Sequence, residues 1–375
     1  MVGTQRCEDQ SFRTAIAAEQ CLGQSLHLQW ASRSAAIHAH AHCMLATRIG
    51  TMRARARFYV AAALTTAINA VQILDGRATA KAIRAELGAE VASIQKTHGV
   101  TPGLGVLLVG DRRDSLTYVR MKRKAADEVG IFSSDVTLPS SASEDDVLEA
   151  VSKLNADPQI HGILVQLPLP SHIDESRILE TINPTKDADG FCYENVARLV
   201  LRGGPRPLAT ACTPAGCVEL LQRYDIPLAG KRAVVLGRSN VVGAPVAALL
   251  QQCDATVTLC HSASENVPDI VREADVVIAA VGKPEYVRGS WLKPGATVID
   301  VGINAVDDAT KKAGYRLVGD VHFDEASQVV SAITPVPGGV GPMTIAMLLS
   351  NVVNLTKASV GLPMAPLPGR LADKV

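Results

Sequence analysis

A tyrosine and a lysine four positions apart stand out as residues that could do chemistry. Tyr118 and Lys122 lie in the stretch 115–130, which follows a polar turn and ends at a glycine. Residues four apart share one face of a helix, so a phenol and an amine would point the same way. Both groups can take part in proton transfer. The alternative is an amphipathic surface helix with solvated charges, which is the commoner use of such residues.

The elements around this helix are expected to place it at a ligand-binding edge. The apolar strand 105–109 runs into the polar turn 110–114, from which the helix can start, and Gly130 ends it. In such a unit the helix begins at the carboxyl end of the strand, where open α/β sheets bind ligands. We therefore expect Tyr118 and Lys122 to face a cleft.

The first half of the chain predicts alternating strands and helices. Strands are expected at 134–138 and 161–166, with a helix at 144–154 between them. Short apolar strands separated by helices favour a mostly parallel sheet covered on both faces. Gln166 ends its strand just before two prolines, which place its amide at the ligand edge. Asp189 lies in an acidic turn, 186–191, that is by itself an ordinary solvated loop.

The second half is expected to begin with a helix at 215–224 and contains a turn typical of dinucleotide binding. A strand enters Gly237, and a helix leaves after Arg238 and Ser239, so free amides at its start could hold pyrophosphate. The spacing is G-x-S-x-x-x-G, so the usual fingerprint is broken. Ser262 lies near the end of the next strand, where an NAD site would carry a carboxylate. The missing carboxylate and the nearby Arg238 favour NADP.

Three later segments complete this half. The strands 274–280 and 296–300 end in turns, 281–284 and 301–304, that we expect to wall the nicotinamide; the second contains Ile303. The segment 334–344, rich in proline and glycine, is either a hinge or a turn that lets a ligand approach the backbone, with a helix at 345–355 after it. Residues 361–375 are expected to be a loose tail.

The composition limits the class of protein. At 375 residues we expect about two domains, and the 37 basic residues balance 37 acidic ones, so nothing draws the chain to nucleic acid. No apolar run is long enough to span a membrane. The eight cysteines lack the paired spacing of a zinc site, and His38, His40 and His42 are expected to be a chance cluster, so no metal is predicted.

The first seventy residues differ from the rest. They contain seven arginines, no lysine and three acids, and no acid occurs between Glu19 and Asp75. The basic, amphipathic stretch from residue 52 is typical of organellar transit peptides. We expect a disordered leader at 1–70 with a mitochondrial or other organellar address; without it the protein would be cytoplasmic.

Six blocks, in this order, resemble the bifunctional methylenetetrahydrofolate dehydrogenase/methenyltetrahydrofolate cyclohydrolase family. They are Tyr118-x-x-x-Lys122, the run 165–170, the run 186–190, Cys212-Thr213-Pro214, Gly237-Arg238-Ser239-x-x-Val242-Gly243-x-Pro245 and the run 335–344. The resemblance covers residues 71 to about 357. Ala211 stands where the family usually has proline, which concerns the shape of a linker and no reacting group.

The resemblance implies a two-domain α/β fold. An α/β folate-binding catalytic domain, 71–211 plus 335–357, would be joined to a Rossmann-like NADP-binding domain, 212–334, with the C-terminal helix returning to the first domain and 358–375 as a flexible tail. It also implies a homodimer formed through the cofactor domains, tetrahydrofolate derivatives as ligands and NADP as cofactor.

The resemblance further implies an activity and a site. Methylenetetrahydrofolate would give hydride to NADP, and the methenyl product would be hydrolysed to 10-formyltetrahydrofolate. Lys122 would assist the hydrolysis, Gln166 would hold Lys122 by a hydrogen bond, Tyr118 would lie along the folate and Asp189 would pair with the pterin. These four are the expected catalytic residues. The folate site would add Val165, Leu167, Pro337, Gly338, Gly339, Val340 and Gly341, and the cofactor site would contain Gly237, Arg238, Ser239, Ser262 and Ile303.

Three other functions stay open at this point. A dehydrogenase acting on a hydroxy or amino acid would need an arginine for the substrate carboxylate and a proton relay, and the six blocks disfavour it. A silent paralogue would bind folate or dinucleotide without turnover, which the presence of Tyr118, Lys122, Gln166 and Asp189 disfavours. A dehydrogenase without cyclohydrolase activity is the third.

Overall fold

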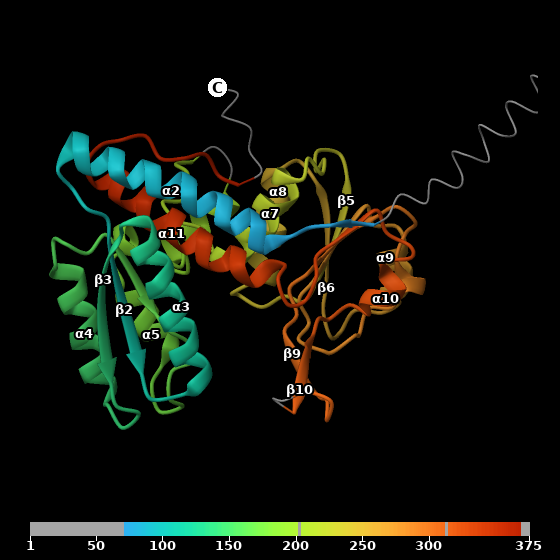
Figure 1. Ribbon diagram of the computed structural model, residues 1–375, viewed down its shortest axis with the longest axis horizontal. Helices are drawn as coiled ribbons and strands as arrows, with labels where there is room; N and C mark the ends of the chain where they lie inside the picture. The colour runs from blue at the N-terminus through green and yellow to red at the C-terminus, as the bar shows by residue number, and fades with distance from the viewer. Residues whose placement is uncertain (1–70, 202–203, 312–313, 369–375) are drawn as a thin grey trace, which may run out of the picture. The chain divides into compact units, whose positions relative to one another are not determined.

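A computed structural model describes residues 71–201, 204–311 and 314–368 of the chain (Figure 1). Its described strands form a three-stranded parallel sheet, a six-stranded parallel sheet and a two-stranded antiparallel hairpin. The prediction of a two-domain α/β fold with parallel sheets is confirmed. The predictions for 1–70 and for the end of the tail, 369–375, concern residues outside those that the structure describes.

The first sheet carries the helix of Tyr118 and Lys122. Its order is β3 (Phe132–Leu138), β2 (Gly103–Val109), β4 (Gly162–Val165), and β2 and β4 are buried along their whole length. Helix α3 (Arg113–Val129) follows β2 directly and ends at Gly130, whose φ of 81° is a left-handed conformation that glycine adopts at little cost. The strand, turn and helix predicted around Tyr118 are therefore present.

Three further α-helices and a short 3-10 helix follow α3 among the described residues of this half. Helix α4 (Glu144–Ala156) begins with a capping box, in which Ser143 and Asp146 satisfy each other's backbone amides. Helix α5 (Glu175–Thr181) follows β4, and the short 3-10 helix Pro184–Lys186 leads to α6 (Tyr193–Val200). The chain between β4 and α5 contains Pro168 and Pro170.

The second sheet runs in the order β1-β11-β8-β7-β5-β6. Its strands are β1 (Gln72–Ile73), β5 (Arg232–Leu236), β6 (Thr256–Cys260), β7 (Val276–Ala279), β8 (Thr297–Asp300) and β11 (Ala332–Ile333). Helices α7 (Cys212–Arg223), α8 (Gly243–Gln252), α9 (Val267–Arg272) and α10 (Phe323–Ala326), with the 3-10 helix Gly289–Trp291, lie in the same half. The hairpin of β9 (Asn304–Asp307) and β10 (Tyr315–Val318) follows β8. Strand β1 and this hairpin were not predicted.

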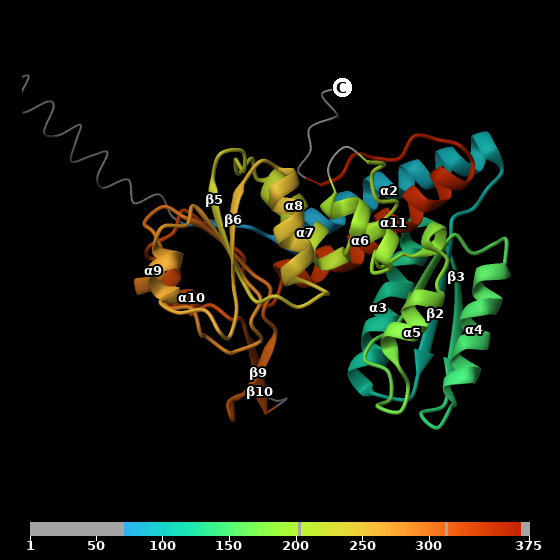
Figure 2. The ribbon, with the colours of Figure 1, turned by 180° about the vertical axis from the view of Figure 1, so that it is seen from behind.

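Two long helices connect the halves. Helices α2 (Gly76–His98) and α11 (Val340–Ser359) lie side by side in both views (Figures 1 and 2), and α11 also packs on α7 and α3. Apolar residues occur on every side of α11, which is expected for a helix with neighbours all around it. The C-terminal helix therefore returns to the first half, as predicted.

Two helices start earlier than the sequence suggested. Helix α7 begins at Cys212 and α11 at Val340, whereas we expected 215 and 345. Each has a proline in its first turn, Pro214 and Pro342, where a helix loses no hydrogen bond to the missing amide proton. Part of the segment 334–344 is thus helical.

No helix among the described residues is both long and apolar enough to cross a membrane. In the same part of the chain no cluster of His, Cys, Asp or Glu side chains has the makings of a metal site. The five cysteines at 192, 212, 217, 253 and 260 are free thiols and are buried.

Candidate active site

Lys122 and Gln166 meet at the carboxyl edge of the first sheet. Lys122 Nζ donates a hydrogen bond of 2.9 Å to Gln166 Oε1, and Gln166 Nε2 donates one of 2.8 Å to the Leu167 carbonyl. The second bond fixes which end of the amide faces the lysine. Helix α3 supplies the amine and the end of β4 supplies the amide, so a rigid strand and a rigid helix set this contact. The half-buried amine is thereby held in one place.

Asp189 lies next to a buried thiol. Cys212 Sγ is 3.7 Å from Asp189 Oδ1 and 3.6 Å from the Ala188 carbonyl oxygen. Burial raises the pKa of Asp189 to about 6, and the positive charge of Lys122 opposes this rise. Burial and the Asp189 charge raise the pKa of Cys212 well above its usual value, so this thiol stays protonated and can donate. The carboxylate is thus electrostatically coupled to Lys122.

Helix α11 holds the chain around Asp189. Asn351 Nδ2 donates to the carbonyls of Ala188 and Thr210, both at 2.8 Å, and lies 3.6 Å from Cys212 Sγ. Asn351 is buried, so these carbonyls have a protein donor in place of water. A second tie joins Thr213 Oγ1 to Thr344 Oγ1 at 2.9 Å. The C-terminal helix therefore positions the acidic turn.

A large pocket opens beside the exposed face of α3; we call it the Tyr118 pocket. It has a volume of about 610 Å³, and its walls come from α3, the turn after β8, the hairpin and the segment 335–342. Tyr118, Pro337, Gly338, Gly339, Val340 and Gly341 line it, as does Ile303, which we had predicted to contact the cofactor. Lys122 lies one helical turn beyond Tyr118. The pocket is large enough for a ligand of drug size.

The second cavity, the Gly237 cavity, lies at the carboxyl ends of β5, β6 and β7. It measures about 310 Å³, and Gly237, Arg238, Ser239 and Ser262 all line it. A Cβ at Gly237 would lie 2.1 Å from the Ala280 carbonyl, and φ there is 107°, so only glycine fits. A Cβ at Gly243 would meet the Gly237 carbonyl at 2.0 Å. The close approach of the α8 start to β5 is the geometry of a dinucleotide turn.

The charges of this cavity suit a phosphate. Arg238 and Lys283 line it, and no carboxylate does so among the residues that the structure describes. Strand β6 ends at Cys260 and is followed by His261 and Ser262, where NAD sites carry an acid. Ser239 Oγ caps the start of α8 by accepting from the amides of Val242 and Gly243, at 3.2 and 3.4 Å. The residues present therefore fit an NADP molecule.

Two family models match most of the described chain. The catalytic domain of the tetrahydrofolate dehydrogenase/cyclohydrolase family matches residues 74–189, and its NAD(P)-binding domain matches residues 211–360. The chain belongs to this family.

Named relatives agree with this membership. The chain is 59% identical over 285 residues to bifunctional protein FolD 4, chloroplastic, of Arabidopsis thaliana, covering 76% of this chain and 79% of the relative. It is 54% identical over 285 residues to the mitochondrial FolD 1 of the same plant, covering 76% and 81%. The crystal structure of the Trypanosoma brucei methylenetetrahydrofolate dehydrogenase-cyclohydrolase, complexed with NADP and an inhibitor, superposes with a TM-score of 0.74 at 48% identity, covering 77% and 98%.

Five of the six sequence blocks of the family lie around the Tyr118 pocket and the end of the first sheet, and the sixth lines the Gly237 cavity. Tyr118 and the segment 337–341 line one pocket, and Lys122 with Gln166 forms the polar pair beside it. Val165, Leu167 and Asp189 are not among the residues lining the Tyr118 pocket; they lie with Gln166 and Cys212 at the end of the first sheet. Ile303 joins the Tyr118 pocket and is absent from the Gly237 cavity.

Several residues at these cavities escaped the sequence analysis. Arg77, Met121, Tyr315 and Leu317 line the Tyr118 pocket, and Tyr286 lines the Gly237 cavity. Lys283 also lines this cavity and lies in the turn 281–284, which was predicted to wall the nicotinamide. Tyr315 and Leu317 belong to a hairpin that the alternation of β and α gives no reason to expect.

Proposed function

We propose that this chain oxidises 5,10-methylenetetrahydrofolate with NADP and then hydrolyses the 5,10-methenyltetrahydrofolate formed to 10-formyltetrahydrofolate. The observation that carries the proposal is the hydrogen bond from Lys122 to Gln166, which fixes an amine beside a pocket of folate size. Membership of the family supports both activities.

The first step moves a hydride from the methylene carbon and leaves a methenyl cation. When bound, NADP supplies the hydride acceptor. No acid or base is required, so the protein contributes alignment. We assign the flat part of folate to the Tyr118 face of α3 and the segment 337–341. Gly237, Arg238, Ser239 and Ser262 are assigned to the dinucleotide, and Ile303 to the point where the two ligands meet.

The second step adds water to the methenyl carbon. The water loses both of its protons: one is released, and the other goes to N5 as the bond between N5 and this carbon breaks, which leaves a formyl group on N10. We assign proton transfer to Lys122 Nζ and the orientation of that amine to Gln166. Val165 and Leu167, which flank Gln166 in the sequence, are also assigned to the folate site.

Asp189 is proposed to bind the pterin. Its carboxylate can accept from the amino and ring nitrogens of the pterin, which are hydrogen-bond donors. Cys212 donates one weak hydrogen bond to Oδ1 of this carboxylate. The carboxylate can therefore still accept hydrogen bonds from the ligand. Asn351 holds this turn from behind. Binding through Asp189 would orient the ligand relative to Lys122.

One experiment separates this function from its alternatives. The protein is mixed with 5,10-methylenetetrahydrofolate and NADP while NADPH and methenyl absorbance are followed. We expect the methenyl signal to rise and then decay to 10-formyltetrahydrofolate. A dehydrogenase without the second activity accumulates methenyltetrahydrofolate, with decay no faster than its spontaneous hydrolysis. A silent paralogue forms no NADPH, although it binds ligand, and this result would refute the proposal.

We also propose residue bounds for the two domains and the tail. We assign 71–211 plus 335–357 to the catalytic domain, 212–334 to the NADP-binding domain and 358–375 to the tail. The return of α11 onto α2 and α3 supports the discontinuous first domain. Strand β1 pairs with β11 and so adds Gln72 and Ile73 to the sheet of the second domain. Limited proteolysis between 201 and 211 would test the first boundary.

The proposal also covers the oligomeric state and the cellular location of the protein. We propose a homodimer formed through the cofactor domains, which light scattering would test against the mass of one chain.

We also propose that the arginine-rich leader, 1–70, directs the protein to a mitochondrion or other organelle. Relatives named chloroplastic and mitochondrial are consistent with this assignment. To test this, residues 1–70 are fused to a reporter protein, and the import of the fusion into mitochondria or chloroplasts is measured.

A further inference from the structure

The segment from Tyr315 to His322 lines the Tyr118 pocket and contacts residues that line the Gly237 cavity. At its start, Tyr315 and Leu317 line the Tyr118 pocket. At its end, the backbone and side chain of Asp320 bind the turn after β7, from which Val281 and Lys283 line the Gly237 cavity. Tyr315 and Leu317 thus belong to the substrate side of this segment, and Asp320 belongs to its cofactor side.

Asp320 is a fully buried carboxylate with four donors. Oδ2 accepts from the amides of Val281, at 2.6 Å, and Gly282, at 2.8 Å. Oδ1 accepts from the Lys283 amide, at 3.0 Å, and from Asn304 Nδ2, at 2.9 Å. Its exposed fraction is 0%. Hydrogen bonds to a buried charge are stronger than those between neutral groups, so the three amides are held firmly.

A second buried carboxylate, Asp300, joins the turn after β8 to the same segment. Asp300 Oδ1 accepts from the amides of Gly302, at 2.9 Å, and Asp320, at 2.8 Å, and Oδ2 accepts from that of Val321, at 2.9 Å. A Cβ at Gly302 would lie 2.3 Å from Asp320 Oδ1, and one at Gly319 would lie 1.8 Å from Asp300 Oδ2. Glycine at both positions lets the carboxylates come this close.

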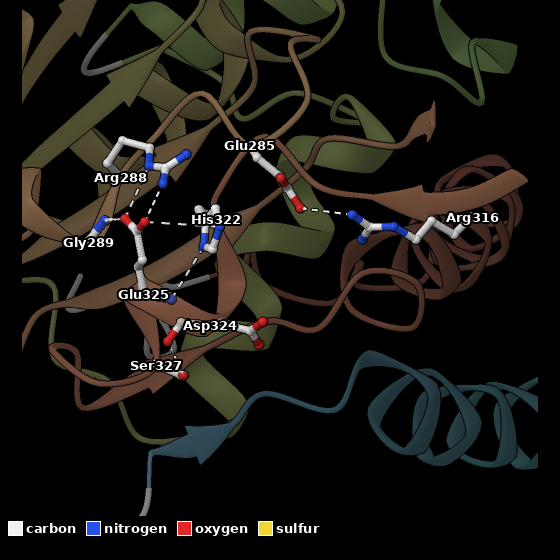
Figure 3. Close-up of polar contacts among 8 residues, drawn as sticks. All are labelled: Glu285, Arg288, Gly289, Arg316, His322, Asp324, Glu325 and Ser327. Carbon is white, nitrogen blue, oxygen red and sulfur yellow. Dashed lines mark hydrogen bonds and ion pairs between the residues drawn. The ribbon is translucent and has the colours of Figure 1, made fainter. Parts of the chain in front are cut away.

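Backbone contacts tie the same segments together. The Glu285 amide donates to the Gly319 carbonyl and the Val287 amide to the Asp320 carbonyl, both at 2.9 Å. Figure 3 shows Glu285 facing Arg316 of β10, at 3.6 Å. The turn after β7 is therefore fixed to the hairpin along several residues, and Asp320 is the side chain at the centre of the connection.

We propose that Asp320 is a positioning residue for hydride transfer, which holds the cofactor-side turn Val281–Lys283 in register with the substrate-side turn Gly302–Asn304. The proposal rests on the proposed function. Hydride transfer needs donor and acceptor carbons about 3–3.5 Å apart, so a displacement of 1 Å costs on the order of 10²-fold in rate. The hydrolysis at Lys122 uses no dinucleotide. Loss of Asp320 should therefore separate the two activities.

Asp320→Asn is the decisive change. The replacement keeps the shape, but its amide nitrogen must face two of the four donors, so one half of the turn loses its acceptor. We expect dehydrogenase kcat to fall on the order of 10²-fold. Hydrolysis of added methenyltetrahydrofolate, measured without NADP, should stay within about threefold of the wild type. A parallel loss of both activities, or no loss of either, would overturn the proposal.

A milder variant and a matched control complete the test. Asn304→Ala removes one hydrogen-bond donor to Asp320 and keeps the carboxylate. If Asp320→Asn does not fold, the activities of Asn304→Ala decide the test. Its dehydrogenase activity should fall roughly tenfold with the hydrolysis unchanged. Equal loss of both activities, or an unchanged dehydrogenase activity, refutes the proposal.

Glu325→Gln is the control, because Glu325 accepts from the Gly289 amide and pairs with Arg288 (Figure 3) but lines neither cavity. Both its activities should match the wild type.

Wild-type protein measured in parallel distinguishes the two levels of failure. If the unaltered protein lacks dehydrogenase or hydrolysis, the proposed function fails. If it performs both steps and Asp320→Asn lowers them together, the proposed function stands and the positioning role fails. Titration with NADP gives an independent readout, because a displaced Val281–Lys283 turn should raise the Kd of Asp320→Asn and not that of Glu325→Gln.

Discussion

Lys122 Nζ and Gln166 Oε1 lie 2.9 Å apart although their residues are 44 positions apart in the chain. This bond places the amine without requiring a charged partner. The hydrolysis needs proton transfer at this amine, whereas hydride transfer needs only alignment of the two ligands. A change at Lys122 should therefore affect the two steps differently.

Lys122→Met should abolish the cyclohydrolase and spare a measurable dehydrogenase. The substitution keeps the apolar stem and removes the amine, so the proton-transfer contribution of about 10²- to 10⁴-fold is lost. Methenyltetrahydrofolate should then accumulate in the coupled assay. Lys124→Met, two positions along the same helix at an exposed site, is the control. Parallel loss of both activities in a folded Lys122 variant that still binds NADP would make Lys122 a substrate-positioning residue instead.

Arg238→Ala should weaken NADP binding selectively. A charge-assisted contact with the 2′-phosphate is worth about 1.5–3 kcal/mol, or roughly ten- to hundredfold in affinity. NAD lacks this phosphate, so its kcat/KM should hardly change. Arg272→Ala is the control, because Arg272 pairs with Asp269 and does not line the Gly237 cavity. Equal catalytic efficiency of the unaltered enzyme with NADP and NAD would contradict the assignment.

Folate binding should weaken as the pH falls through 6. Burial raises the pKa of Asp189 to about 6, so below this pH the carboxyl becomes protonated and accepts fewer donors from the pterin. The KM for methylenetetrahydrofolate should therefore rise between pH 7.5 and 5. In Asp189→Asn the KM should be high throughout and lack this step. Persistence of the step in that variant would show that another group titrates.

Asn351→Ala should lower the free energy of unfolding. The variant leaves the carbonyls of Ala188 and Thr210 without their donor, at a cost of about 1–3 kcal/mol for each buried group. Urea denaturation measures the change. Asn354→Ala is the comparison, since Asn354 is on the same helix but only accepts from the Ala365 amide in the tail. A smaller loss in the Asn351 variant than in the Asn354 variant would contradict this account.

A protein starting at Val71 should keep both activities. The motifs assigned to the site begin beyond this residue, and strand β1 starts at Gln72. Activity and circular dichroism of the shortened protein would test the boundary. Unfolding or inactivation on removal of 1–70 would place the leader within the fold.

The sequence predicted the local parts of the site better than its walls. Helix α3 and its end at Gly130 follow from spacing and a glycine within one element, so Tyr118 and Lys122 were placed correctly on one helix. The partnership of Lys122 with Gln166 came from family resemblance, because no local pattern joins a helix to a distant strand end. Strand β1 has two residues, too few for any periodicity, and its partner is β11. Tyr315 and Leu317 depend on a hairpin that only the structure reveals.

The buried carboxylates show another limit. Asp300 ends the predicted strand 296–300, and Asp320 follows a hairpin that was not predicted, so nothing in the sequence indicated that either acid is buried. Their burial follows from the amides of two turns converging on them, a relation among segments distant in the chain. Burial raises the pKa of Asp300 to about 7, so its ionisation opposes stability increasingly as the pH rises from about 4, the unfolded value, to above 7.

The pairing of β1 with β11 has a consequence for the order in which the protein is made. Gln72 pairs with Ala332 and Ile73 with Ile333, so the sheet that carries the Gly237 cavity takes its edge strand from the start of the folded chain. A ribosome releases β11 only after nearly all the intervening sequence has left the tunnel. Until then β1 has no partner, and α2 lacks α11, the helix that covers it. Both domains should therefore complete their cores together, late in synthesis, and not one after the other.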